Sequence, residues 1–599
     1  MILSPNNRTL YTEALAPPSG FILDTAIAAT YSMDLTTLLS VPLQLVLQST
    51  EDSAELMKDP IALYEALQRA TKRVHVFAQQ GQIKAPRQHH LLYSLLEPMI
   101  TEVVAPAGGN FHPKMWLLRF VTEDGDNFTY RLLLPSKNLT TDRAWDVALT
   151  LDGKLANRVN ANGAAIANFV EQLPNMAVNE FPLSREFNSL LAELPRVVWE
   201  LPDGFDQLHF HLLGFGGRKW RPKKNKKLAV ISPFIRPEAL KVLAKTSDTP
   251  LAVISRSESL AELGGAAPFH SAYVLHDAAE TEDGEDHNAN SSEIGLHAKV
   301  YIYQIGNRTH IALGSANATN AALIADKNIE ILAELAGPSY KVGNVESFLD
   351  PYVDAGLGQY LVPWILDENH EPDSSTQENK RLLEAARAAL LTAGLTLSCS
   401  QEEESWPLDL TVSAPIVFEG VTSAVAWPVT VGSDRAVDFR PLVVGKKIRM
   451  PVQSIESLTS LIAFKLQAGG ENLSFALNLP VTGMPEARER AILRSVVNNR
   501  DGFLRYLLLL LAGLGDGADV GTVARAFSGS DASQLASAFD DMPLLEELVR
   551  AFCREPKRLK KVRRLVNDIS TDGDADNILP ENFIGLWKVF EEAMEHHER

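Results

Sequence analysis

A short pattern of polar residues occurs twice in this chain, with its members in the same order each time. A histidine and a lysine stand two residues apart, and a serine and an asparagine with the same spacing follow further along. The members are His112, Lys114, Ser136 and Asn138 in the first copy and His297, Lys299, Ser315 and Asn317 in the second. One H-x-K alone is uninformative. Its recurrence together with S-x-N predicts two similar folding units that each supply half of one site.

The residues around each copy predict how the polar side chains are presented. Each H-x-K stands at the head of an apolar run, at 115–118 and at 300–303, which is typical of a strand. Residues i and i+2 of a strand point to the same face, so the imidazole and the ammonium emerge side by side. Each S-x-N ends a second apolar run, and Gly314 allows a tight turn before the second one.

An acid completes each copy. Asp146 lies in the stretch WDVALTLDG and Glu330 in the stretch IEILAELAG, and the two align residue for residue up to their closing glycines. A carboxylate there can accept the Nδ1 proton of the histidine, which fixes the tautomer of the imidazole and raises its nucleophilicity. Such a set of residues suits phosphodiester transfer through a histidine.

This constellation resembles the phospholipase D superfamily, whose signature is H-x-K with a downstream G-S-x-N in two copies per active site. The second copy, HAK and GSAN, matches, whereas the first copy has Pro135 where the glycine stands. The aspartate that often follows H-x-K in lipid-cleaving members is replaced by Arg119 and Gln304. In lacking this aspartate, the chain is more similar to the nuclease and tyrosyl-DNA phosphodiesterase branches than to the lipases. The resemblance covers roughly residues 20 to 365.

The resemblance implies a phosphodiesterase that needs no metal and no other cofactor. One histidine attacks phosphorus to give a phosphohistidine, and the other protonates the leaving oxygen and then activates water. Analogy favours His112 as the nucleophile and His297 as the acid, although the sequence leaves the order open. The lysines and asparagines would hold the nonbridging oxygens. The candidate catalytic residues are His112, Lys114, Asn138, Asp146, His297, Lys299, Ser315, Asn317 and Glu330.

A basic segment between the two copies is the candidate nucleic-acid contact. The stretch RKWRPKKNKK at 218–227 has seven basic residues of ten, in a chain with a formal net charge of −19. It is interpreted either as a solvated loop or as a loop that grips backbone phosphates. Its candidate residues are Arg218, Lys219, Lys223, Lys224, Lys226 and Lys227. A second basic group at 557–564 is assigned to the solvated face of a helix.

The segment at 276–293 is acidic and of low complexity, and it precedes the second H-x-K. Such a composition does not bury enough apolar surface to fold. It is interpreted either as an inert insertion or as a negatively charged flap that competes with nucleic acid for the two lysines.

The predicted fold class is α/β, with two phospholipase D-like halves related by a pseudo-twofold axis, then a small β-rich domain and a helical C-terminal domain. The boundaries are 1–205 and 206–365 for the halves, 366–400 for a linker and helix, 401–483 for the β-rich domain and 484–599 for the helical domain. Opening strands are expected at 21–30 and 228–235. Helices are expected at 59–71, 380–392, 486–497, 503–512, 531–539, 543–554 and 582–597.

Length and composition bound the class of protein. At 599 residues, with 45 % hydrophobic and 22 % charged residues, a soluble protein of several domains is expected. The two cysteines, Cys399 and Cys553, favour a reducing cytoplasm, and no signal peptide or membrane-spanning run is recognised. No phosphate-binding loop is found, so an ATPase or helicase partner would have to drive any translocation. A homo-oligomer is compatible with the sequence.

Two functions are therefore carried forward. The first is a nuclease or DNA-end phosphodiesterase, with DNA favoured as substrate, in a bacterial antiviral defence or restriction system. The alternative is a noncatalytic subunit that binds nucleic acid or serves as a scaffold and keeps the duplicated fold for its shape.

Overall fold

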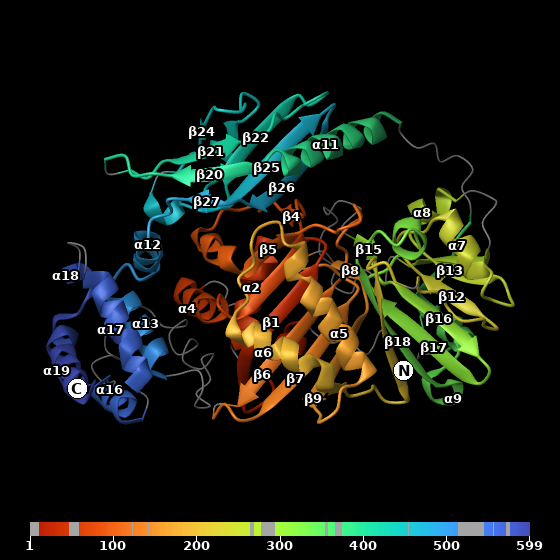
Figure 1. Ribbon diagram of the computed structural model, residues 1–599, viewed down its shortest axis with the longest axis horizontal. Coiled ribbons are helices and arrows are strands. Elements are labelled where there is room, and N and C mark those ends of the chain that lie inside the picture. Colours follow the sequence, from red (N-terminus) through yellow and green to blue (C-terminus); the bar gives the residue numbers. More distant parts are fainter. Residues whose placement is uncertain are drawn as a thin grey trace.

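The computed structural model describes most of the chain. The described residues are 11–46, 59–122, 124–141, 143–217, 219–263, 269–276, 294–353, 357–365, 374–403, 405–452, 454–512, 544–554, 556–570 and 575–598. They form a mixed α/β structure with several sheets (Figure 1). Within this part of the chain, no helix has both the length and the apolar character needed to cross a bilayer.

The first large sheet has seven strands in the order β10-β9-β7-β6-β1-β3-β5. Its strands are β1 (Phe21–Thr30), β3 (Val74–Gln79), β5 (Ile100–Val103), β6 (Met115–Thr122), β7 (Phe128–Pro135), β9 (Ala148–Leu155) and β10 (Val197–Trp199). Strands β1, β3 and β5 are parallel, and the others continue the sheet antiparallel to their neighbours. All six residues of β3 are buried, as expected for a parallel strand covered on both faces.

The second large sheet repeats this arrangement, in the order β11-β18-β17-β16-β12-β13-β14-β19. Its strands are β11 (Gln207–Leu213), β12 (Leu228–Ile231), β13 (Leu251–Ile254), β14 (Phe269–Leu275), β16 (Val300–Ile305), β17 (Arg308–Gly314), β18 (Glu330–Pro338) and β19 (Leu361–Pro363). Strands β12, β13 and β14 are parallel, and β16, β17 and β18 follow antiparallel. Strand β12 thus occupies the place of β1, and β16 the place of β6.

Two short parallel contacts join the sheets in a reciprocal way. Strand β8 (Arg143–Trp145) pairs with β15 (Ile294–Leu296), and Phe111 forms a bridge with Ile329. One apolar core includes residues of both sheets, such as Leu117 and Ile302. Because each contact joins the segment before one H-x-K to the segment before the other copy's acid, the two motifs meet at one place.

Helices cover the outer faces of the first sheet. Helices α2 (Leu35–Val46) and α4 (Pro60–Ala70) pack on one face, and α5 (Ala161–Gln172) and α6 (Arg185–Glu193) belong to the core on the other. Asp59 caps α4 by accepting hydrogen bonds from Ile61 N and Ala62 N. The helix predicted at 59–71 is therefore confirmed.

The region after the second sheet begins with α11 (Ser374–Thr392) and is rich in strands. A six-stranded sheet has the order β2-β4-β26-β25-β22-β23, in which β25 (Leu461–Ala468) and β26 (Glu471–Asn478) form a long hairpin. Strands β22 (Ser423–Pro428) and β23 (Val437–Asp438) continue this sheet on the side of β25. Strands β2 (Met33–Asp34) and β4 (Ile83–Lys84) come from the N-terminal region. The predicted β-rich segment is thus joined by its own sheet to the first half, above which it lies in Figure 1.

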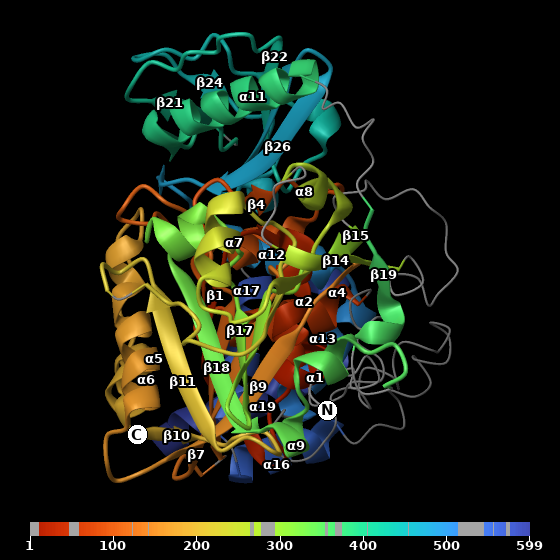
Figure 2. The ribbon, with the colours of Figure 1, turned by 90° about the vertical axis from the view of Figure 1, so that its right-hand side faces the viewer.

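Helices dominate the end of the chain, as the periodicity predicts. They are α12 (Ala487–Val496), α13 (Arg500–Ala512), α16 (Leu544–Arg554), α17 (Pro556–Ser570), α18 (Ala575–Ile578) and α19 (Glu581–Glu598). The helix predicted at 531–539 lies outside the described residues. Tyr506 on α13 donates to Glu65 on α4 at 2.9 Å, so these helices contact the first half, and both views show them on the side of α2 and α4 (Figures 1 and 2).

Candidate active site

The two lysines of the repeated pattern are buried where the two sheets meet. Lys114 precedes β6 and is 1 % exposed, and Lys299 precedes β16 and is 0 % exposed. Each ammonium donates to the carbonyl of the histidine two residues earlier, at 2.8 Å to His112 and at 2.6 Å to His297. An ammonium has three N–H donors, so each lysine retains two for a ligand.

His112 is oriented by an acid from the other copy of the pattern. Its Nδ1 lies 3.0 Å from Oε2 of Glu330, which is completely buried. The other carboxylate oxygen accepts from Asn328 Nδ2 at 3.2 Å. Because a carboxylate only accepts hydrogen bonds, Nδ1 carries the proton and Nε2 keeps its lone pair. The linear order of the motif does not indicate this pairing between copies.

His297 reaches the same tautomer through a backbone group. Its Nδ1 lies 2.8 Å from the carbonyl oxygen of Ser136, which only accepts, so Nδ1 is the donor. The 3.2 Å approach of Lys299 Nζ to that nitrogen is then a contact between two donors. Burial lowers the pKa of Lys299, and the charge of Asp146, the acid of the first copy, opposes part of this effect.

The backbone around both histidines repeats from one copy to the other. His112 N donates to Ile329 O at 2.9 Å, and His297 N donates to Trp145 O at 2.8 Å. In both copies, the residue that accepts this bond immediately precedes the acid. The two copies therefore hold their H-x-K segments with the same local geometry.

The two serines tie each S-x-N to the strand that carries the acid. Ser136 N donates to Val147 O at 2.7 Å and its Oγ accepts from Val147 N at 2.9 Å. Ser315 repeats this with Ile331, with both bonds at 3.0 Å. Because both hydroxyls hold backbone groups and are buried, the geometry gives Ser315 a positioning part in the site.

The two asparagines close the turns after the serines. Asn138 O accepts from Thr140 N at 2.9 Å, and Asn317 O accepts from Thr319 N at 2.8 Å. Oδ1 of Asn317 lies 3.4 Å from Ser232 Oγ. Oδ1 of Asn138 is buried without a hydrogen-bond partner within the described chain. This oxygen only accepts hydrogen bonds, whereas the Nδ2 hydrogens of the two amides are the donors that a phosphate oxygen would need.

Burial and mutual repulsion set the charge of the site. Burial lowers the pKa of Lys114 to about 7, although Glu330 acts in the opposite direction. Burial and the charge of Lys114 hold the pKa of Lys299 well below its ordinary value. Burial and both lysines do the same to the pKa of His297, and burial lowers the pKa of His112 against the pull of Glu330. The empty site therefore disfavours the charged forms of these groups, and a bound anion would favour them.

Three further residues belong to the site and were missed in the sequence. Tyr31 packs its ring 5.1 Å from that of His112 and 5.6 Å from Lys114 Nζ. Asn328 supports Glu330, and Arg256 donates to Leu296 O at 2.9 Å, beside His297. The sequence offers only weak signals for them: Tyr31 and Arg256 follow apolar strands, and Asn328 stands two residues before the acid Glu330.

The basic segment lies at the other end of the second sheet. Lys226 N donates to Gln304 O at 2.9 Å, whereas the H-x-K end of β16 pairs near Ile231. Lys224 is paired with Asp248 at 2.8 Å, Lys227 is paired with Glu346, and Lys219 donates to Ile324 O. The one aromatic, Trp220, is buried against Glu334 and is not exposed for stacking. Arg218 lies outside the described residues, and nucleic-acid binding by this segment stays a prediction.

Other histidines of the second sheet bind a buried carboxylate and are not part of the candidate site. Glu334 accepts from His211, His310 and Tyr303 at 2.9, 3.1 and 2.7 Å, which holds its pKa far below the ordinary value. Among the described residues, no group of three or more His, Cys, Asp or Glu side chains is placed to hold a metal ion. The acidic segment at 277–293 lies outside the described residues.

No protein-family model and no curated protein matches the chain. Among solved structures, yeast tyrosyl-DNA phosphodiesterase 1 has a TM-score of 0.34 and 11 % identity, over 55 % of this chain and 87 % of the yeast chain. Polyphosphate kinase from Porphyromonas gingivalis has a TM-score of 0.29 and 14 % identity, over 63 % of this chain and 53 % of the kinase.

Proposed function

We propose that this chain is a metal-independent phosphodiesterase of the phospholipase D type that cleaves nucleic acid, with DNA favoured, through a phosphohistidine. The observation that carries the proposal is the 3.0 Å hydrogen bond between His112 and Glu330, residues 218 positions apart. It prepares one imidazole with a free Nε2 lone pair beside two buried ammonium groups. The equivalent topology of the two sheets supports an origin by duplication.

In the first step, Nε2 of His112 attacks phosphorus in line, and the bond from phosphorus to the leaving oxygen breaks. Protonated His297 gives its Nε2 proton to that oxygen. In the empty site, the lysines disfavour this protonated form of His297. A bound phosphodiester anion offsets their charge and thereby favours it. Glu330 stabilises the positive charge that develops on His112.

In the second step, neutral His297 takes a proton from water, and the resulting hydroxide attacks phosphorus. The bond from phosphorus to His112 Nε2 breaks, and the free imidazole returns. Lys114, Lys299 and the amides of Asn138 and Asn317 hold the nonbridging oxygens throughout, so the protein itself stabilises the charge on them. The two steps balance as hydrolysis of one phosphodiester.

The residues that replace the lipase-type aspartate have structural roles here, which supports a nucleic-acid rather than a lipid substrate. Arg119 is 5 % exposed and paired with Asp24 at 2.7 Å and with Glu193 at 2.9 Å. The backbone of Gln304 pairs with that of Lys226. A bacterial defence context, an ATPase or helicase partner, a cytoplasmic location and homo-oligomers stay predictions from the sequence.

The test is hydrolysis of single- and double-stranded DNA, RNA and phosphatidylcholine by the full chain in excess EDTA. We expect a nucleic acid to be cleaved with an undiminished rate, and the matched double variant His112→Asn/His297→Asn to be inactive. Activity that is lost on chelation and restored by magnesium or manganese would reject the chemistry. Tight binding of nucleic acid without turnover of any substrate would instead favour the noncatalytic alternative.

A further inference from the structure

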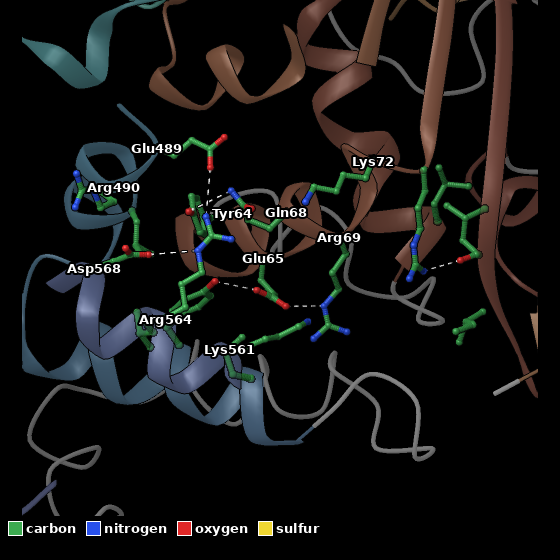
Figure 3. A pocket seen from close by; sticks show the side chains of 18 of the residues that line it. Tyr64, Glu65, Gln68, Arg69, Lys72, Glu489, Arg490, Lys561, Arg564 and Asp568 are labelled. Carbon is green, nitrogen blue, oxygen red and sulfur yellow. Dashed lines mark hydrogen bonds and ion pairs between the residues drawn. The ribbon is translucent and has the colours of Figure 1, made fainter. Parts of the chain in front are cut away.

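A cavity of about 450 Å³ lies between the first half and the C-terminal helices, far from the histidines. Its walls come from β1, α4, α12, α13 and α17, as Figure 3 shows in part. Its volume falls within the range of small-molecule sites, roughly 300 to 1,000 Å³. The cavity therefore has room for a ligand of the size of a nucleotide.

The lining carries more cations than anions. Its basic residues are Arg69, Lys72, Arg73, Arg490, Lys561 and Arg564, and its acidic residues are Glu65, Glu489 and Asp568. The carboxylates are engaged by arginines: Glu65 pairs with Arg69 at 2.6 Å, and Glu489 and Asp568 both lie near Arg564. The lining thus keeps a surplus of positive charge.

Four of these cations have no ion-pair partner within the described chain, and they include Lys72 after α4 and Lys561 on α17. Figure 3 shows the side chains of Lys561 and Arg69 extending toward each other from the two helices. Burial, together with the charges of Arg69 and Arg73, lowers the pKa of Lys561. Among the described residues, Glu65 is the one carboxylate near this pair: it is ion-paired with Arg69 and partly offsets the effect of the arginines on Lys561. The cations still outnumber it, and such a group suits an anion with several oxygens.

Apart from Gln68, the rest of the lining is apolar or aromatic. Phe21, Leu23 and Tyr64 contribute from the first half, and Leu493 and Leu565 from the C-terminal helices. Phe21 is half-buried and the other four are almost completely buried, so together they form a compact apolar wall. A phosphate joined to a flat, largely apolar base matches both parts of the cavity.

The cavity lies at the end of β1 opposite to the catalytic site. Leu23 lines the cavity, whereas Thr30 accepts from Leu139 N in the turn that carries Asn138. Seven residues of strand separate Leu23 from Thr30, which corresponds to roughly 23 Å at about 3.3 Å per residue. A ligand in the cavity therefore does not contact the reacting phosphate.

We propose that this cavity binds a nucleoside phosphate, whose phosphate groups lie among Arg69, Lys72 and Lys561 and whose base lies against the apolar wall. The inference is independent of the catalytic proposal, because it concerns other residues and is tested by binding alone. Since one wall comes from each end of the chain, the ligand also bridges the C-terminal helices and the first half. Ligation should therefore stabilise the folded protein.

The experiment is calorimetric titration of the full chain with ADP, with the melting temperature as a second readout. We expect one ADP to bind per chain with a Kd below about 1 mM and to raise the melting temperature as its concentration increases. The double variant Lys72→Gln/Lys561→Gln should bind at least tenfold more weakly. Neither lysine belongs to the buried core, and an unchanged melting temperature without ADP shows that the variant folds.

A matched control and two competing ligands make the result decisive. Lys557→Gln/Lys588→Gln removes the same charge from α17 and α19 outside the lining and should bind ADP like the wild type. Absence of ADP binding, or equal weakening in both double variants, would overturn the site. Pyrophosphate that binds as tightly as ADP would overturn the nucleoside part. A pentadeoxynucleotide that displaces ADP and binds more tightly would overturn the small ligand in favour of nucleic acid.

Discussion

Glu330 accepts a hydrogen bond from Nδ1 of His112 at 3.0 Å, although Glu330 begins β18 of the second sheet and His112 precedes β6 of the first, in the other copy of the repeated pattern. Neither copy can form the site alone, because the histidine of the first copy is oriented by the acid of the second. His297 has a different partner, the carbonyl of Ser136 at 2.8 Å. A carboxylate stabilises an imidazolium more strongly than a carbonyl does. This asymmetry supports His112 as the residue that becomes positively charged by attack on phosphorus.

Glu330→Gln should therefore reduce kcat on a nitrophenyl phosphodiester by about 10² to 10⁴-fold, with a smaller effect on KM. The amide keeps the shape of the side chain but does not stabilise the charge on His112. Asp146→Asn is the matched control from the first copy and should cost less than about tenfold, because His297 donates to a carbonyl. A Glu330→Gln protein with a normal circular dichroism spectrum and a kcat within threefold of the wild type would contradict the proposal that Glu330 stabilises the charge on His112.

Lys114 should make the stability of the wild type depend on pH. Its pKa is about 7 in the folded protein and about 10.5 when exposed, so between these values the unfolded chain binds more protons. The free energy of unfolding should then rise with pH from about 7 to about 10.5, and the full cost of burying the charge is present below pH 7. Lys114→Met should be inactive and more stable at pH 7, by about 1 to 3 kcal/mol.

Urea unfolding of both proteins at pH 6, 7, 8.5 and 10 measures this difference. The advantage of Lys114→Met should be constant at the two lower values and should shrink toward pH 10. The exposed lysine Lys72 provides a control, since Lys72→Met should leave the pH dependence unchanged. An advantage that grows with pH would show that the sign is wrong.

The sequence predicted the strands and the polar residues of the site better than their mutual contacts. The alternation around H-x-K and S-x-N is local, and β6, β7, β16 and β17 lie where it predicts them. The pairing of His112 with Glu330, the acid of the other copy, depends on how the two sheets pack, and a local sequence pattern does not predict it. Tyr31 is a similar case, because it contacts His112 only after β1 and β6 have paired.

For the basic segment, the local sequence predicts more than the folded structure shows. Its composition predicted a single patch, but ion pairs divide it, because Asp248 and Glu346 lie close to Lys224 and Lys227 only in the folded chain. The shared sheet of β4 and β26 was likewise missed, since it joins residues that are far apart in the sequence. The sequence predicts both regions only as separate local features.

The ion pairs of the basic segment lead to a prediction within it. Lys223→Ser/Lys226→Ser removes two lysines for which no ion-pair partner is found in the described chain, and Lys224→Ser/Lys227→Ser removes two that are paired. If the segment contacts nucleic acid, the first variant should reduce the slope of log K against log salt by up to about 2, and the second by less. Turnover of a nitrophenyl phosphodiester should be unchanged in both. Equal salt slopes in all three proteins would remove the segment from the binding surface.

The last prediction assigns the two histidines. His112→Asn should form no covalent intermediate, because the asparagine offers no nucleophilic nitrogen at neutral pH. His297→Asn should still permit attack on a nitrophenyl phosphodiester, whose leaving group needs no protonation, and should then retain the phosphohistidine because no base activates water. Rapid mixing followed by an alkaline quench, in which phosphohistidine survives, should show a burst and a labelled protein for His297→Asn alone. A burst from His112→Asn instead would reverse the two parts. If neither variant is labelled while the wild type is active, the covalent mechanism is wrong.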